Sequence, residues 1–294
     1  MNALPTRRPL VLAARVLAML GTLLTVSAAA LAQGAAALVI DTQGTATLRS
    51  KAALQILAEV PPGTELTLAA GARAVLVHSG NGVEYTLSGP GEFRWGNDGA
   101  QALRGGQIAT REPLGGTLRE VRLRTARLVQ ASVAMRGEPR AEALQLASPA
   151  STWLLDPPAL FRWAPVPGVQ SYRFELTDDR GGVLFSAESV TATQIVLPAE
   201  VKLEAGRTYA WQVRTQRADG SRVEGWTEFG IAAPELAARA RALQPAPEGR
   251  FADRLLYAAL LEEWGLHEPA DAVWASLRDE RPEERNLAAR ASRR

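Results

Sequence analysis

The chain has no cysteine and only two histidines, His78 and His267, among its 294 residues. The absence of thiols excludes disulfides, thiolate nucleophiles, zinc ribbons and iron–sulfur clusters. The two histidines lie far apart in the sequence, and neither has an acidic residue at the spacing of a metal site. The chain also contains no phosphate-binding glycine loop and no nucleophile-elbow motif. We therefore expect no enzyme activity, no metal and no cofactor.

Charge excludes a second class of function. The chain carries 33 basic and 31 acidic residues, a formal net charge of +2. Removing the three arginines of residues 1–32 leaves 30 basic against 31 acidic side chains, a net charge of −1. This balance gives no support for a nucleic-acid partner. The pair Asp178-Asp179 precedes two glycines between apolar segments, which is typical of a hairpin turn rather than of paired catalytic acids.

Residues 1–32 have the pattern of a signal peptide. Arg7-Arg8 precede an uncharged run, 16–32, which ends in the small-x-small sequence 30–32. We expect cleavage before Gln33 and a periplasmic protein that meets the membrane only through its leader. An uncleaved anchor is the alternative. The arginine pair also partly resembles a twin-arginine leader, so the export route stays open between Sec and twin-arginine.

Residues 33–111 are predicted to form an all-β module. Apolar and polar residues alternate in short segments, and glycine-containing turns separate them about every ten residues. The module resembles the FecR domain in four successive segments: 44–48, 62–66, 71–76 and 82–87. The FecR sigma regulators that it resembles carry a cytoplasmic arm before a membrane span. Only eight residues precede the apolar leader here, so we expect the module without that arm.

Residues 112–148 are predicted to connect two β modules. The alternation at 121–125 fits a strand, whereas the spacing of Leu118, Arg122, Thr125 and Val129 fits a helix, so periodicity does not decide between them. An excess of arginine in this segment suits either contact with an anionic polymer or an ordinary solvated face. Mixed surface charge is common, and we favour the solvated face.

Residues 149–233 are predicted to form a β-sandwich, because short alternating segments recur through them. Tyr209, at the end of the segment 203–209, fits a tyrosine corner. With Trp163 and Trp226, this pattern resembles a fibronectin type III domain, which implies a sandwich of two sheets. Aromatic residues that share one strand face, such as Tyr209 and Trp211, indicate core packing rather than a ligand platform.

Residues 234–294 are predicted to be helical, with helices over 235–243 and 250–264 and a third that opens near Pro269. Gly265 is the expected end of the second helix. We expect the arginine-rich tail, 285–294, to fray. Four positions in this region resemble the second half of a tetratricopeptide repeat: Gly265, Ala270, Trp274 and Pro282.

The helical pair carries more apolar side chains than one two-helix contact can bury. The candidate interaction surface consists of Leu256, Leu260, Trp264, Trp274 and Leu277. Three coverings are possible: the sandwich, a second copy of the chain, or another envelope protein.

These features together predict a mainly β protein with a FecR-like β module, a fibronectin type III-like β-sandwich and a small C-terminal α-helical hairpin. We expect an exported, non-enzymatic binding or scaffold protein of the bacterial cell envelope. Its expected partner is an envelope protein or a cell-wall polysaccharide, and it is a possible homo-oligomer. The alternative is a periplasmic sensory component of a FecR-type signalling system that lacks the cytoplasmic arm.

Overall fold

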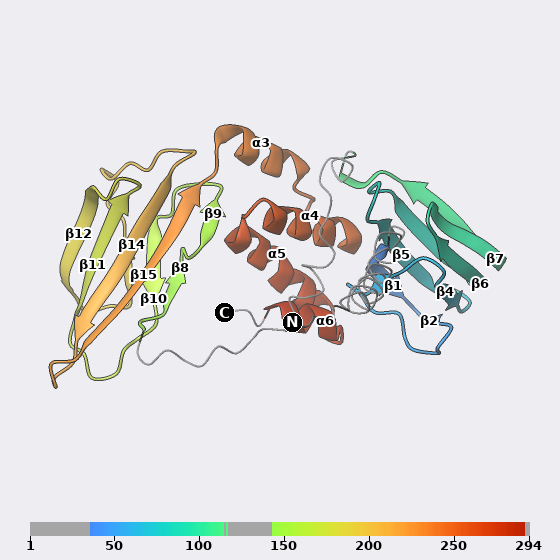
Figure 1. Ribbon diagram of the computed structural model, residues 1–294, viewed down its shortest axis with the longest axis horizontal. Helices are drawn as coiled ribbons and strands as arrows, with labels where there is room; N and C mark the ends of the chain where they lie inside the picture. Colours follow the sequence, from blue (N-terminus) through green and yellow to red (C-terminus); the bar gives the residue numbers. More distant parts are fainter. Residues whose placement is uncertain (1–35, 115, 117–142, 292–294) are drawn as a thin grey trace, which may run out of the picture.

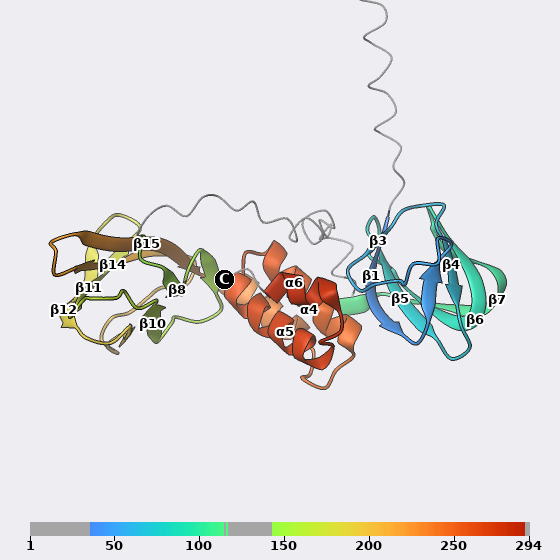
Figure 2. The same cartoon turned by 90° about the horizontal axis from the view of Figure 1, so that it is seen from below.

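The computed structural model describes residues 36–114, 116 and 143–291, and three parts lie in a row within them (Figure 1). A β module lies at one end, a β-sandwich lies at the other, and the C-terminal helices lie between the two. Figure 2, turned by 90°, shows the same order. The prediction of a mainly β protein with a helical C-terminal region is confirmed. The predicted leader and most of the predicted connecting segment lie outside the described residues.

The first β module is a seven-stranded antiparallel sheet with the order β2-β4-β6-β5-β1-β3, in which β7 pairs with β6. Its strands are β1 (Ala37–Gln43), β2 (Ala46–Leu48), β3 (Glu59–Val60), β4 (Glu65–Leu68), β5 (Arg73–His78), β6 (Glu84–Gly96) and β7 (Gly99–Arg111). Strand β4 shows why the alternating segments form strands. Leu66 and Leu68 are buried, whereas Glu65 and Thr67, which alternate with them, are not.

Strand β1 is buried on both faces. Ala37 and Val39 belong to the core inside the first module, together with Phe93 and Trp95. Leu38 and Ile40 point the other way and join a core made mainly by the C-terminal helices. A strand that is covered on both faces has a continuous apolar sequence rather than an alternating one, as residues 36–40 do.

The sandwich consists of two sheets, with strand orders β13-β10-β8 and β12-β11-β14-β15-β9. Its strands are β8 (Leu146–Ser148), β9 (Thr152–Leu154), β10 (Leu160–Trp163), β11 (Tyr172–Asp178), β12 (Val183–Val190), β13 (Gln194–Val196), β14 (Thr208–Gln216) and β15 (Arg222–Ile231). Strand β9 pairs in parallel with β15, and the other pairs are antiparallel.

Aromatic rings fill the space between the two sheets. Phe161 lies edge-on to Phe174 and to Trp211, with ring centroids 5.2 and 5.3 Å apart. The predicted tyrosine corner is present, because the hydroxyl of Tyr209 accepts the backbone N–H of Glu204 at 2.7 Å. The tyrosine corner and the aromatic core therefore have the arrangement that the sequence predicts.

The helical region contains α3 (Pro234–Leu243), α4 (Phe251–Glu263), α5 (His267–Glu280) and α6 (Arg285–Ala291). Proline begins α3, where its missing N–H has no intrahelical partner to lose. Gly265 ends α4 with a φ of 76° and accepts the backbone N–H of Trp153 from the sandwich at 2.9 Å. None of the helices among the described residues is both long and apolar enough to cross a membrane.

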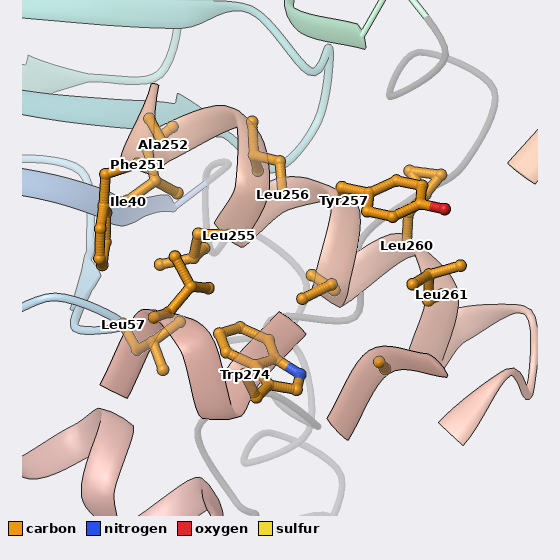
Figure 3. Close-up of a cluster of buried hydrophobic side chains, with 14 of the residues drawn as sticks. Ile40, Leu57, Phe251, Ala252, Leu255, Leu256, Tyr257, Leu260, Leu261 and Trp274 are labelled. Carbon is orange, nitrogen blue, oxygen red and sulfur yellow. The ribbon is translucent and has the colours of Figure 1, made fainter. Parts of the chain in front are cut away.

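Helix α4 lies at the centre of the molecule and is buried along nearly its whole length. Figure 3 shows its side chains between Ile40 and Leu57 of the first module and Trp274 of α5. Trp153 and Leu155, from the sandwich end of the molecule, pack against the same core. One apolar core thus contains side chains from the first module, the helices and the edge of the sandwich.

Candidate functional site

The helical surface predicted to meet a partner is buried inside the chain. Leu256, Leu260 and Leu277 are fully buried, and Trp274 is 2% exposed. Trp264 is half-buried beneath the guanidinium of Arg239, whose Cζ lies 5.4 Å from the ring centroid. The candidate interaction surface is therefore largely covered within the chain itself.

The cover for these side chains comes mainly from the first module, which was not among the three coverings expected. Leu38 and Ile40 of β1 and Val75 and Val77 of β5 form the apolar face on which the helices lie. The sandwich, one of the coverings considered, contributes the smaller set Trp153, Leu155 and Ala232. The first module therefore takes the place that a partner would have filled.

Trp226 is the tryptophan that faces solvent. All seven tryptophans lie within the described residues. Six of them are buried or partly buried, whereas Trp226, in β15, has 62% of its surface exposed. Its neighbours Val223 and Phe229, on the opposite face of the strand, are buried in the sandwich core. The ring therefore lies on the outer face of the five-stranded sheet.

A row of polar side chains continues from Trp226 across the sheet. The strand register places Trp226 opposite Gln212 of β14, Gln212 opposite Glu175 of β11, and Glu175 opposite Ser186 of β12. Side chains opposite each other on one sheet face lie about 5 Å apart at the Cβ atoms. Four strands thus present one aromatic ring and three polar groups in a line.

Hydrogen bonds hold the middle of this row in place. Gln212 donates through Nε2 to the carboxylate of Glu175, and Arg214 donates through Nη2 to Oε1 of Gln212 at 2.7 Å. Arg214 also lies 3.6 Å from Glu224 through its Nε. Because each of these side chains has a partner in the sheet, their rotamers are restricted before any ligand arrives.

The combination of groups on this face, which we call the Trp226 face, suits a neutral polar ligand with flat apolar patches. The Trp226 face comprises Trp226, Gln212, Glu175, Ser186 and Arg214. An indole ring offers a flat apolar surface. The amide and hydroxyl groups can donate and accept hydrogen bonds, the carboxylate accepts them, and the guanidinium donates them.

The histidines and the acid pair lie in separate elements: His78 ends β5, His267 begins α5, and Asp178 ends β11. His78 is buried, accepts the backbone N–H of Gly80 at Nδ1 and lies 2.8 Å from the carbonyl of Asn97 at Nε2. Asp178 accepts two backbone N–H groups of its own turn, and these hydrogen bonds, that of Gly182 first, lower the pKa of the carboxyl. Among the described residues no group of three or more His, Cys, Asp or Glu could hold a metal ion.

Trp226 entered the sequence-based prediction only as part of the fibronectin-like pattern, so the exposure of its ring was not predicted. The signal was available in the alternation of β15, where the apolar Val223 and Phe229 occupy the opposite parity to Trp226. A residue at that parity faces away from the core.

Comparisons with known proteins found solved structures of low sequence identity and low TM-score. No family model matches the chain, and no curated protein sequence matches it. CopC from Methylosinus trichosporium OB3b is 20% identical, with 31% of this chain and 95% of that chain covered and a TM-score of 0.24. An Fn3-like protein from Clostridium thermocellum is 21% identical, with 32% and 88% covered and a TM-score of 0.20.

A third structure, the BSP domain of a biofilm associated protein, is 11% identical. The match covers 69% of this chain and 25% of that chain, with a TM-score of 0.21. The FecR and tetratricopeptide resemblances receive no support from these matches.

Proposed function

We propose that the chain is an exported, non-enzymatic binding protein of the bacterial cell envelope that holds polysaccharide on the Trp226 face. The observation that carries this proposal is the exposure of Trp226 on the outer sheet face, beside a row of hydrogen-bonded polar side chains. The leader features of residues 1–32 support export, and the near-neutral charge of the remaining chain suits an uncharged polymer.

The chemistry of a sugar ring matches this face. One side of a pyranose carries mostly C–H groups, which lose contact with water when they stack on an indole ring. The ring hydroxyls lie around its edge, where the amide of Gln212 and the carboxylate of Glu175 can bond to them. A polysaccharide lying across the strands would meet Trp226 first and the polar row with its next units.

The shared helical core supports a scaffold role beside binding. Trp153 donates its backbone N–H to Gly265 at the end of α4, and Thr152 accepts the backbone N–H of Glu268 at 3.1 Å. These contacts join the sandwich to the helices, while α4 packs on β1 of the first module. A polymer bound on the sandwich is thereby held at a set place relative to the first module.

The test is the binding of the exported protein, with its leader removed, to purified peptidoglycan and to soluble chitooligosaccharides. We expect Trp226→Ala to weaken binding by about tenfold or more, because exposed aromatic anchors dominate such interfaces. The matched control is Val196→Ala, which removes a side chain of 66% exposure from the other sheet and should leave binding unchanged.

Tryptophan fluorescence gives an independent measurement. Ligand binding should shift the emission of the wild-type protein to shorter wavelength and protect it from iodide quenching, and Trp226→Ala should lose both effects. Equal binding by wild type and Trp226→Ala would refute the proposal.

A further inference from the structure

A pocket lies where the first module meets the helices. Its volume is about 490 Å³, and it is lined by β1 and β5 on one side and by α4, the loop before it and the end of α5 on the other. Pockets of this size hold small organic ligands. The residues that carry the argument are Asp41, Arg73, Arg250, Arg254, Glu280 and Arg281.

Asp41 lines this pocket and has a buried acceptor atom without a hydrogen bond. Its side chain is only 9% exposed, and its Oδ1 accepts no hydrogen bond. Oδ1 does have an ion-pair contact, at 3.6 Å, with Nη2 of Arg281. Desolvation by burial raises the pKa of this carboxyl, although Arg281 and Arg73 act in the opposite direction. A buried carboxylate oxygen without a donor is costly, so the site favours a molecule that brings one.

Arg73 also lines the pocket and has a buried donor atom without a hydrogen-bond partner. Its Nε is buried and has no hydrogen-bond partner among the described residues. Arg73 lies in β5, and β5 pairs directly with β1, which carries Asp41. Two residues that line one small space therefore each have a buried polar atom without a hydrogen bond, a donor in Arg73 and an acceptor in Asp41.

Arg281 and Arg254 also line the pocket, and contacts within the protein hold both side chains in place. The guanidinium of Arg281 donates to the carbonyl of Thr42 at 3.3 Å, and its Cζ lies 4.9 Å from the ring centroid of Phe251. Arg254 donates through Nε to the carbonyl of Gly249 at 3.1 Å and pairs with Glu280. Because these groups are held before binding, little rotamer freedom remains to be lost.

We propose that this pocket binds a small hydroxycarboxylate, such as a sugar acid. The ligand carboxylate would accept hydrogen bonds from Arg73 and from the remaining N–H groups of Arg281, and guanidinium groups match carboxylates in shape. A neighbouring hydroxyl would donate to Oδ1 of Asp41. A simple carboxylate brings no donor for Asp41, and a neutral sugar brings no charge for the arginines.

The ligand requirement is tested by calorimetry with three probes on the leaderless protein. Glucuronate carries both groups, glucose carries only hydroxyls, and propionate carries only the carboxylate. We expect glucuronate to bind at least about tenfold more tightly than either of the others, since each lacks one of the two interactions. Equal affinity for glucuronate and propionate, or no binding of glucuronate, would overturn the proposal.

Variants then locate the site. Arg73→Gln should weaken glucuronate binding about tenfold, and Asp41→Leu should abolish the preference for glucuronate over propionate. The matched control is Arg49→Gln, which removes the same charge from a side chain that is 82% exposed in the first module. Thermal melting of each variant shows whether it folds, and glucuronate should raise the melting temperature of the wild type but not of Arg73→Gln.

The Trp226→Ala variant separates this pocket from the polysaccharide face. It should bind glucuronate with unchanged affinity, because Trp226 lies in the sandwich and the pocket does not. Loss of glucuronate binding in Trp226→Ala, or its retention in both pocket variants, would show that the pocket is not the site.

Discussion

Glu84 of β6 accepts a hydrogen bond of 2.7 Å from Arg250, which precedes α4 and lies 166 residues later in the chain. The Glu84 side chain is 1% exposed and also pairs with Arg111 of β7 at 2.7 Å. Arg111 in turn pairs with Asp253 in the first turn of α4. Four charged side chains thus join the first module to the start of the central helix.

We expect Glu84→Gln to destabilise the protein by roughly 1–3 kcal/mol at neutral pH, because two arginines lose their buried partner. Burial alone would raise the pKa of Glu84, but hydrogen bonds from Arg111 and Arg250 outweigh it and the pKa is lowered. The stabilisation is therefore complete above the ordinary value of 4.5 and is lost as the pH falls through the lowered pKa. Urea unfolding across this range measures the effect.

The control for Glu84 is Glu65→Gln, which removes a carboxylate from an exposed pair with Arg94 in the same module. Exposed ion pairs contribute little, so this variant should unfold nearly as the wild type does. An equal loss in both variants would contradict the role assigned to the buried network.

Asp41→Asn should stabilise the protein at neutral pH, the opposite of the effect expected for Glu84→Gln. Burial raises the pKa of Asp41 above its ordinary value of 3.8, so the folded state holds its proton more tightly than the unfolded state. Stability from this group consequently falls as the pH rises through the raised pKa. The neutral amide should raise the unfolding midpoint at neutral pH and remove this part of the pH dependence. A lower midpoint for Asp41→Asn would contradict the prediction.

Tyr209→Phe should destabilise the sandwich by roughly 1–3 kcal/mol, because the backbone N–H of Glu204 loses its acceptor. Thermal melting followed by near-ultraviolet circular dichroism measures this loss. Tyr85→Phe is the comparison, since its hydroxyl bonds to the carbonyl of Asp98 in the other β module. If the sandwich transition moved as much in Tyr85→Phe as in Tyr209→Phe, the corner would not be its cause.

Gly265→Ala should weaken the junction between the helices and the sandwich. The backbone at Gly265 has a φ of 76°, and an added Cβ would lie 3.0 Å from Cδ1 of Trp153. Gly181→Ala, with a φ of 80° and nothing within 4 Å of the added Cβ, separates the backbone strain from the clash. We expect both to cost about 1 kcal/mol in strain and Gly265→Ala to cost more. Differential scanning calorimetry compares the two, and equal losses would remove the role of Trp153.

Leu256→Ala should destabilise the helical core by about 2–5 kcal/mol, the usual cost of a cavity at a fully buried leucine. Leu103→Ala, at a leucine that is 45% exposed on β7, should change stability little. Limited proteolysis gives a second measurement, because undocked helices would be cut sooner. Unchanged stability and unchanged cleavage in Leu256→Ala would contradict the packing of α4 on the first module.

The elements with regular local patterns could be predicted from the sequence. The alternation of β4 and the Tyr209 corner depend on residues close together in the chain, and the structure has both. The burial of β1 on both faces was also signalled, because residues 36–40 are continuously apolar. The sequence could not show what covers the second face, since the covering helices begin some two hundred residues later.

The end of the chain shows how tertiary contacts override local expectation. The segment expected to fray contains α6, in which Leu287 is 1% exposed and Arg290 pairs with Glu262 of α4. The guanidinium of Arg290 also lies over the ring of Trp274, with its Cζ 4.7 Å from the ring centroid. A short arginine-rich helix has little stability alone, so only these partners explain its order.

The two candidate sites also differ in how far the sequence predicts them. Trp226 could have been placed on the outer face from the parity of β15 alone. The pocket around Asp41 could not, because Arg73 and Arg281 reach it from a neighbouring strand and from the end of a distant helix. No spacing in the sequence relates these three residues.

The packing of α4 on β1 determines when the protein can finish folding. Leu38 and Ile40 leave the ribosome well before α4 and the other helices that cover them have been synthesised. Until then the nascent chain carries an uncovered apolar sheet face, which is a site for aggregation or chaperone binding. The first module is completed only when these helices have been synthesised.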